Sequence, residues 1–237
     1  MRWRNKRVLK LAHMSSGYAG RRCMQSFLEC WREELEKKIR ATPMGSNLES
    51  KIGNLRSQVA TEDDLARIED RIDAKLPPSY RDFLLLGGGG LRLAGTLVVG
   101  ELDYGFYLAD DVRAFDQVDS AAVAIWTNAG DVGDEAYYVY DATQDSIHIR
   151  ASALSTALAV GDDFGGGYYL LNPKEILMDG EWEAWYLSPH LPGAYRYMSF
   201  ADLLARTFVI DILDEDASPV MTREGFRGTC AEHLFNS

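Results

Sequence analysis

Hydrophobic residues recur at intervals of three and four over residues 61–76, and polar residues fill the positions between them. The apolar positions are Leu65, Ile68, Ile72 and Leu76. This spacing places one hydrophobic stripe on a helix whose other faces are charged, so it predicts an amphipathic helix that packs on a core. Thr61 can accept the first free helical N–H groups, and the acidic residues 62–64 suit the positive end of the helix dipole. The helix is therefore expected to begin at Thr61.

A second, shorter helix is predicted directly after the first. Leu76 precedes a proline, which disfavours helical geometry at Leu76. Pro78 suits the first turn of a new helix, where its missing N–H costs nothing. The apolar face of this helix would consist of Tyr80, Phe83 and Leu84. The glycine run at residues 87–90 then ends it.

A third helical pattern covers residues 21–40. One stripe contains Cys23, Phe27, Trp31, Leu35 and Ile39. Residues 41–47 contain Pro43 and Gly45, which break the pattern and are typical of a linker. We therefore expect residues 1–47 to be a helical extension with a linker, residues 48–213 to be a domain, and residues 214–237 to be a partly ordered tail. The extension either packs on the domain or mediates self-association.

After residue 90 the pattern changes to short segments rich in aromatic and β-branched residues, separated by Asp, Gly and Asn turns. We expect strands at residues 97–99, 122–127, 136–140, 146–150, 168–171 and 183–187. Residues 136–140 and 146–150 are expected to pair as a hairpin. Helices are expected at residues 110–117 and after Ser199, where Asp202 completes a capping box. The predicted fold is α+β, with N-terminal helices, a twisted and mainly antiparallel sheet of about five to seven strands, and a closing C-terminal helix.

Three blocks of the chain resemble the SUKH superfamily. The first contains Leu76, Pro77, Tyr80, Phe83 and Leu84 before the glycine run, and the second is AVGDDFGGGYYLLNP at residues 159–173. The third is GEWEAWYLSP at residues 180–189 with MSFADLLART at residues 198–207. The resemblance covers roughly residues 60 to 210. It implies a binding protein, because bacterial members are mostly immunity proteins that neutralise a cognate toxin, and fungal relatives are cell-wall regulators.

The net charge of −11 conceals an uneven distribution. Residues 1–28 contain seven of the 25 Lys and Arg residues and no acid, so the rest of the chain has 18 basic against 36 acidic side chains. Such a body repels nucleic acid and anionic membranes and steers a basic partner, although high charge also simply favours solubility. No apolar run reaches the roughly 18 to 20 residues that a membrane span needs, so we expect a cytoplasmic protein. The three cysteines, Cys23, Cys30 and Cys230, are expected to be reduced.

No motif supports catalysis, a cofactor or a metal. The glycine run follows a helix and lacks the spacing of a phosphate-binding loop, and the four histidines show no zinc-ligand spacing. Residues 161–167 lack the ligand pattern of a calcium loop. Four carboxylates near aromatic residues could serve a glycoside hydrolase, namely Asp162, Asp163, Glu181 and Glu183. Because 36 acidic side chains make close carboxylates common, the hydrolase is only the third hypothesis.

Protein binding is the main hypothesis. In residues 182–187, Trp182 and Tyr186 share one strand face and Trp185 shares the other with Leu187, so one pair is expected in the core and the other exposed or covered by a helix. The expected partner-binding residues are Asp110, Asp111, Asp131, Asp134, Glu135, Asp162, Asp163, Trp182, Trp185 and Tyr186. These would cover a basic surface on a cognate toxin, as in an immunity protein. A housekeeping scaffold or regulator is the second hypothesis, and the oligomeric state stays open.

Overall fold

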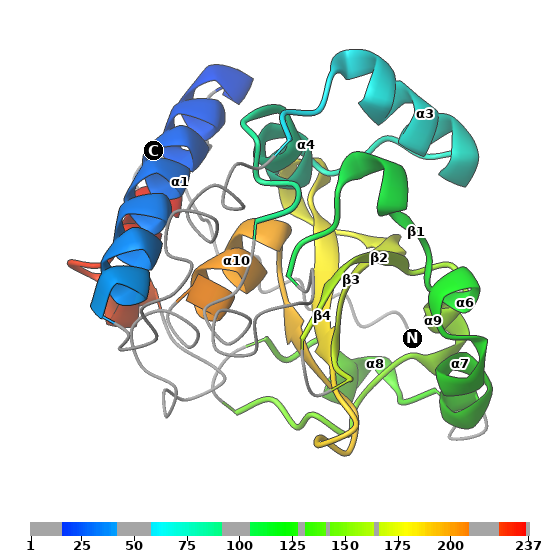
Figure 1. The fold of residues 1–237 in the computed structure, drawn as a ribbon. Helices are drawn as coiled ribbons and strands as arrows, with labels where there is room; N and C mark the ends of the chain where they lie inside the picture. The colour runs from blue at the N-terminus through cyan, green and yellow to red at the C-terminus, as the bar shows by residue number, and fades with distance from the viewer. Residues whose placement is uncertain are drawn as a thin grey trace.

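A five-stranded antiparallel sheet lies between two groups of helices (Figure 1). The strands are β1 (Arg113–Ala114), β2 (Leu158–Asp162), β3 (Tyr168–Ile176), β4 (Trp182–Leu187) and β5 (Ala194–Tyr197), and they lie side by side in sequence order. Every pair of neighbours is antiparallel. The α+β prediction is therefore confirmed, including the number of strands expected.

The computed structural model describes residues 16–41, 58–91, 105–127, 131–140, 143–163, 166–208 and 223–235. The strand expected at residues 97–99 and most of the linker lie outside these residues. Within them, the strands expected at residues 168–171 and 183–187 are confirmed as parts of β3 and β4.

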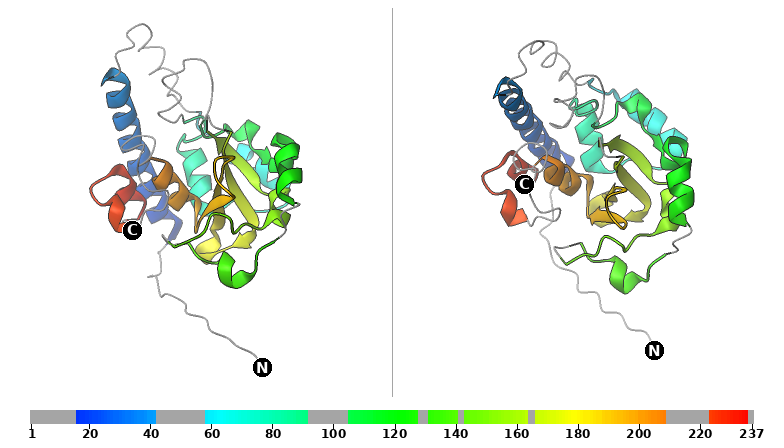
Figure 2. Two further views of the ribbon diagram at one scale, coloured as in Figure 1. Left: turned by 90° about the horizontal axis from the view of Figure 1, so that it is seen from below. Right: turned by 60° about the horizontal axis from the view of Figure 1, so that its bottom comes forward.

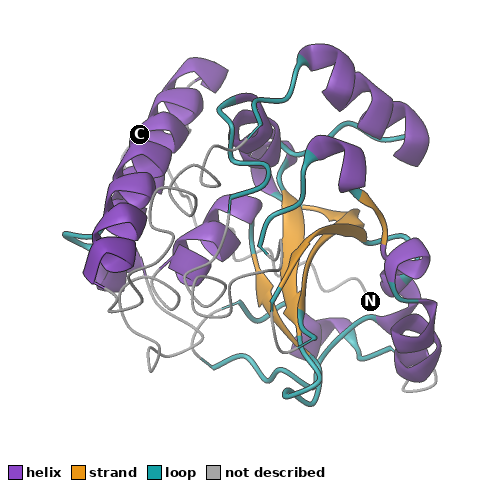
Figure 3. Ribbon diagram, in the orientation of Figure 1, coloured by secondary structure: helices purple, strands orange, loops and turns teal. Residues whose placement is uncertain are grey.

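Successive residues of the central strands point to opposite faces of the sheet, and both faces are buried. On β3, Tyr169 and Leu171 belong to one hydrophobic core, whereas Leu170 belongs to the other. A sheet covered on both faces needs two layers of helices, and Figure 3 shows the helices on either side of the strands. We name the two cores by the helices that cover them: the α10 core and the α9 core.

The α10 core is covered by four helices that the sequence predicted, namely α1 (Ser16–Ala41), α3 (Glu62–Ile72), α4 (Pro78–Leu85) and α10 (Phe200–Phe208). The 3-10 helix η5 (Cys230–Leu234) also packs on this core, and it was not predicted. The Thr61 cap of α3 is confirmed, because the Thr61 hydroxyl accepts from the Asp64 N–H at 3.2 Å and the Thr61 N–H donates to the Asp64 carboxylate at 2.7 Å. At the start of α10 the Ser199 hydroxyl accepts from the Asp202 N–H at 3.1 Å and donates to the Asp202 carboxylate at 2.9 Å.

The glycine run at residues 87–90 follows the end of α4, as the sequence predicts, and two of its glycines are needed for different reasons. Gly87 has a φ of 79°, which glycine adopts without strain, and it follows the end of α4. Gly88 leaves room for the aromatic ring of Phe83, because a Cβ on Gly88 would lie 2.3 Å from that ring.

Helix α1 packs on the α10 core and is part of it. Phe27, Trp31 and Leu35 have no exposed surface, and the Trp31 ring meets Phe106 edge-on with 6.2 Å between centroids. The Arg32 guanidinium donates to the Gly87 carbonyl at 2.7 Å, which ties α1 to the end of α4. Of the two alternatives for the N-terminal helix, packing on the domain is the one observed.

The α9 core is covered by short helices, and here several strand predictions were wrong. Its helices are α6 (Phe115–Val118), α7 (Ser120–Thr127), α8 (Asp134–Tyr137) and α9 (Ala151–Leu154). Residues 122–127 lie in α7 and residues 136–140 begin in α8, whereas residues 146–150 form only one isolated bridge, between Asp131 and Arg150. The helix expected at residues 110–117 is divided among the 3-10 helix η1 (Ala109–Asp111), β1 and α6.

The expected hairpin between residues 136–140 and 146–150 is absent, and β5 instead bonds to backbone carbonyls of this segment through the Arg196 side chain and the Ala194 N–H. The buried Arg196 of β5 donates to the carbonyls of Val139, at 3.1 Å, and His148. Ala194 N–H donates to the Ser146 carbonyl at 2.8 Å, and this approach requires the neighbouring glycine, because a Cβ on Gly193 would lie 2.0 Å from the same oxygen.

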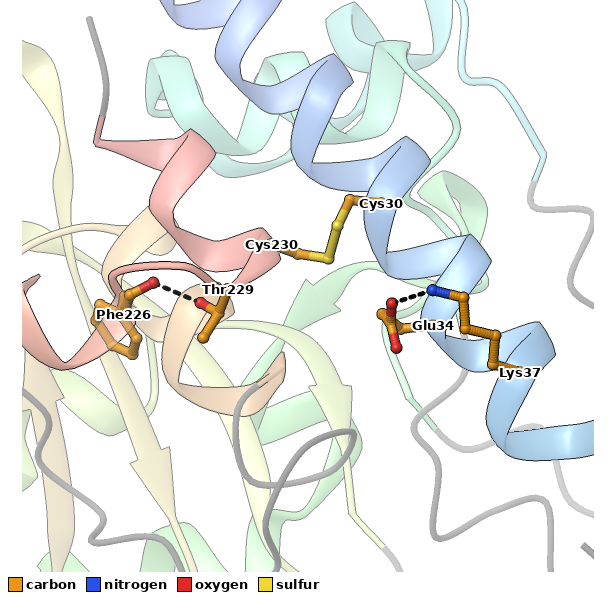
Figure 4. Close-up of a disulfide and its surroundings, with 6 residues drawn as sticks. All are labelled: Cys30, Glu34, Lys37, Phe226, Thr229 and Cys230. Carbon is orange, nitrogen blue, oxygen red and sulfur yellow. Dashed lines mark hydrogen bonds and ion pairs between the residues drawn. A yellow bond between two sulfur atoms is a disulfide. The ribbon is translucent and has the colours of Figure 1, made fainter. Parts of the chain in front are cut away.

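Cys30 and Cys230 form a disulfide, which corrects the expectation of reduced thiols (Figure 4). It links α1 to η5 across 200 residues of sequence. Both views of Figure 2 show the C-terminal segment beside α1, so the two ends of the described chain meet there. The pairing was not evident from sequence because residues so far apart show no spacing pattern. Disulfides are rare in the cytosol, so the bond weighs against the cytoplasmic location, which stays a prediction.

Candidate functional site

The first two acidic candidates, Asp110 and Asp111, lie in η1 at the surface. The Asp110 side chain is 79% exposed and lies 3.5 Å from Arg67 of α3. The Asp111 side chain is 60% exposed and lies 3.7 Å from Arg113. Ion pairs this exposed contribute little to stability, so both carboxylates are available to a partner.

The next three candidates surround the start of α9 and α8. Asp131 accepts hydrogen bonds from the N–H and the hydroxyl of Ser152, at 3.0 and 2.6 Å, and these bonds lower its pKa. Asp134 is 81% exposed and pairs with Arg150, and Glu135 is exposed. Asp131 thus has a structural role at the N-terminus of α9, whereas Asp134 and Glu135 present their charge to solvent.

Asp162 and Asp163 are engaged in the turn between β2 and β3. The Tyr107 hydroxyl donates to Asp162 at 2.7 Å, and burial raises the pKa of that carboxyl. Asp163 accepts from the Gly167 N–H at 2.7 Å and from the Tyr186 hydroxyl. Both carboxylates are half-buried and hydrogen-bonded, so their first role is to fix this turn.

The aromatic candidates belong mostly to the interior. Trp182 is 2% exposed in the α10 core and Trp185 is fully buried in the α9 core. The predicted division of the two faces is correct, but both faces are core, so neither tryptophan contributes surface for a partner. Tyr186 is half-buried, and its hydroxyl holds Asp163.

The structure contains a buried cluster of polar side chains around Glu183, which the sequence analysis did not predict. The Glu183 carboxylate has no exposed surface and accepts from the hydroxyls of Tyr137 and Tyr140 and from the Asn172 amide, the last two at 2.9 and 3.0 Å. Burial raises the pKa of Glu183. The guanidinium of Arg196 lies 4.9 Å from the centre of the Tyr137 ring. The signal in the sequence was a charged residue at an inward position of each strand, in WEAWYL and AYRY.

The carboxylates considered for a hydrolase occupy separate environments. Glu183 is buried in the cluster just described, whereas Glu181 accepts from the N–H and the hydroxyl of Ser79 at the start of α4, at 2.8 and 2.7 Å. Asp162 and Asp163 hold the β2–β3 turn. Each of the four carboxylates therefore has hydrogen-bond donors of its own within the fold, which favours structural roles over a shared catalytic one.

Within the described part of the chain, no group of three or more His, Cys, Asp or Glu side chains is arranged to hold a metal ion. None of the described helices is long and apolar enough to cross a membrane.

Five candidates thus remain at the surface, and we call them the acidic border. They are Asp110, Asp111, Asp131, Asp134 and Glu135. All come from one stretch of sequence, from η1, which lies beside α3, to α8, which belongs to the layer of short helices over the α9 core. The border is extended, so it suits the surface of another protein better than a small ligand.

Comparison with known families gives one result. The model of the SMI1 / KNR4 family (SUKH-1) matches residues 59–206, which span α3 to most of α10. All of α1 and all of η5, including the two bonded cysteines, lie outside this match. No curated protein and no solved structure matches the chain.

Proposed function

This chain belongs to the SMI1 / KNR4 family (SUKH-1), and on that premise we propose that it is a non-catalytic protein that binds and neutralises a cognate toxin. The proposal has two levels. Binding of a protein partner follows from the family resemblance and the surface charge. The immunity role is the finer step, and it takes its support from what the resemblance implies for bacterial members.

The observation that carries the proposal is the acidic border. In residues 109–137 the chain has seven acidic side chains and a single basic one, Arg113. Exposed carboxylates of one sign attract a basic protein from a distance and accelerate its encounter. The same charge disfavours nucleic acid and anionic membranes as partners.

The mechanism we propose is steric and electrostatic. A toxin that acts on an anionic substrate needs a basic binding surface, and a protein with an acidic border can cover that surface and exclude the substrate. No bond is made or broken by the binding protein. Its residues need only fit and hold the toxin.

The first experiment is protection. This protein is co-expressed with the toxin encoded by the nearest gene, and survival of the host cells is compared with cells that express the toxin alone. We expect survival. Death of the cells in both cases would refute the immunity role and favour a housekeeping scaffold or regulator of the same fold.

The second experiment tests steering. Association rates with the toxin are measured across ionic strength for the wild type and for the Asp111→Asn, Glu135→Gln double variant. We expect slower association and a weaker salt dependence in the variant. The matched control is Glu29→Gln with Glu33→Gln, which removes the same charge from exposed positions of α1. Equal effects of the two double variants would show that only net charge matters, and not the border.

A further inference from the structure

Helix α7 is unusual because it is apolar on every side and yet lies at the surface. Its sequence, SAAVAIWT, contains no charged residue. Ala122, Val123 and Trp126 pack against the α9 core. Ala121, Ala124 and Ile125 are exposed, and Ile125 is 69% exposed. A helix that is hydrophobic all round is normally buried, so the exposed face of α7 requires an explanation.

The three exposed residues form one continuous strip, which we call the α7 ridge: Ala121, Ala124 and Ile125. Positions separated by three and four residues lie above one another on a helix. The two alanines are small and leave the Ile125 side chain as the highest point of the strip. Such a shape fits a shallow apolar depression on another protein.

Acidic residues lie before and after α7. The Asp119 carboxylate accepts from the Ala122 N–H at 2.8 Å at the start of the helix. Asp116 is exposed in the preceding α6. On the other side, Asp131 binds Ser152 of α9, and α9 packs against α7. The ridge is thus an apolar strip with carboxylates at the start of its helix and on the neighbouring α9.

Two nearby basic side chains balance part of this charge. Arg150 is paired with Asp134 and Glu175, and its side chain is only 20% exposed. The exposed ammonium group of Lys174 donates to the neutral Ser152 carbonyl at 2.8 Å, so it keeps its positive charge and offsets part of the charge of Asp131. Asp116 of α6 and Asp119 at the start of α7 lie in a stretch, residues 109–137, whose one basic residue is Arg113.

We propose that the α7 ridge is the apolar centre of the partner-binding surface, and that it takes a protein whose apolar side chains are ringed by Lys or Arg. The inference rests on the proposed function and adds to it where the partner binds. An apolar centre with a charged rim is the usual arrangement of a protein interface. A second copy of this chain is a poor occupant, because two acidic rims would then face each other.

The test uses a substitution whose two possible effects have opposite signs. Ile125→Asp removes the apolar centre and adds a negative charge. If the surface attracts a basic partner by charge alone, the variant binds more tightly. If the apolar centre matters, it binds more weakly. The matched control is Ile147→Asp, since Ile147 is 55% exposed and follows Ser146, which bonds to β5 at the sheet edge opposite β1.

The first probe is a helical peptide of Leu and Lys with one apolar face, and a Ser and Lys peptide of equal length and charge serves for comparison. Dissociation constants are measured by calorimetry at low salt. We expect Ile125→Asp to weaken binding of the Leu and Lys peptide by about tenfold and Ile147→Asp to change it by less than about twofold. Unchanged or tighter binding by Ile125→Asp, or equal binding of the two peptides to the wild type, would overturn the proposal.

The second probe is the toxin of the neighbouring gene, which separates this inference from the proposed function. If the wild type fails to protect, the immunity role is refuted, and the peptide measurement still decides the role of the ridge. If the wild type protects and Ile125→Asp protects equally well, the ridge is not the binding centre. Ile125→Ser is the alternative should the Asp variant fail to fold. Dimerisation of the wild type that Ile125→Asp abolishes would assign the ridge to a second copy and contradict the proposal.

Discussion

The hydroxyl of Tyr137 donates a hydrogen bond to the carboxylate of Glu183, and both side chains are fully buried. The bond joins α8 to β4, an interior strand of the sheet. A buried carboxylate is unfavourable unless donors surround it, and Glu183 has three donors from the fold, the other two being Tyr140 and Asn172. The bonds to Tyr137 and Tyr140 hold the segment after α8 against the sheet.

Tyr137→Phe should therefore destabilise the protein. The change leaves the ring in place and removes one donor from a buried carboxylate, which typically costs about 1–3 kcal/mol. The matched control is the neighbouring Tyr138→Phe, because the Tyr138 hydroxyl bonds to Glu175 at 2.9 Å but its side chain is exposed. We expect Tyr138→Phe to lower the free energy of unfolding by less than about 0.5 kcal/mol. Urea denaturation measures both, and equal effects would show that the bond to Glu183 has no special importance.

The ionisation of Glu181 should make the stability of the protein depend on pH. Burial raises the pKa of Glu181 from 4.5 to about 7, even though Ser79 donates two hydrogen bonds to it. A carboxyl whose pKa is higher in the folded state stabilises the fold most when it is protonated. Its contribution is therefore fully present below 4.5 and is lost as the pH rises to about 7.

Glu181→Gln is expected to remove that loss, because the amide cannot ionise. The urea midpoint of the wild type, measured between these two pH values, should fall relative to that of the variant as the pH rises. Glu135→Gln, at an exposed carboxylate, serves as the control and should follow the wild type. Parallel curves for all three proteins would disprove the role assigned to Glu181.

The sequence predicted the α10 core better than the α9 core, for a physical reason. Helices α1, α3 and α10 are long enough to show a hydrophobic period, and the Thr61 and Ser199 caps mark two of their starts. The helices of the α9 core have four to eight residues, which is too short for a period to be recognised. In α7 the run AVAIW has the β-branched and aromatic residues of a strand, and tertiary packing decides in favour of a helix.

The surface was harder to predict than the fold. Alternation in β4 correctly separated Trp182 from Trp185, but sequence cannot tell whether a second layer covers the other face of a sheet. Burial of both tryptophans follows from the α9 layer, so cover by a helix, and not exposure, is the alternative observed for the second face. The exposed ridge at Ile125 was not predicted either, because the sequence pattern favours a strand at residues 122–127 and the ridge exists only on a helix.

Phe83→Ala should destabilise the α10 core by about 3–5 kcal/mol, because the ring is fully buried and the cavity cannot collapse easily. The centroid of its ring lies 4.9 Å from that of Phe200 and 5.1 Å from that of Phe106, so these two aromatic side chains lose a contact at once. The exposed Val59→Ala is the control, with an expected change below about 0.5 kcal/mol. A urea denaturation midpoint of Phe83→Ala equal to that of the wild type would contradict the packing described.

Removal of residues 1–44 tests whether the domain begins at residue 48. Trp31 and its neighbours on α1 fill the same core as Phe83 and Phe106, so we expect the truncated protein to lose fixed tertiary packing. Near-ultraviolet circular dichroism and hydrophobic-dye binding measure this loss. A truncated protein with native spectra and a cooperative transition would instead support an independent domain from residue 48 onward.

Breaking the disulfide should lower stability without changing the fold of residues 59–206. Cys30→Ser frees η5 from α1, and a bond that closes so long a loop typically contributes about 2–5 kcal/mol. Cys23→Ser, in the same helix but outside the disulfide, is the matched control and should change little. Midpoints are compared with and without a reductant. Reductant should lower the midpoint of the wild type and of Cys23→Ser. It should leave the midpoint of Cys30→Ser unchanged, because that variant has already lost the bond. An unchanged midpoint of the wild type in reductant would mean that the covalent link between α1 and η5 does not stabilise the fold.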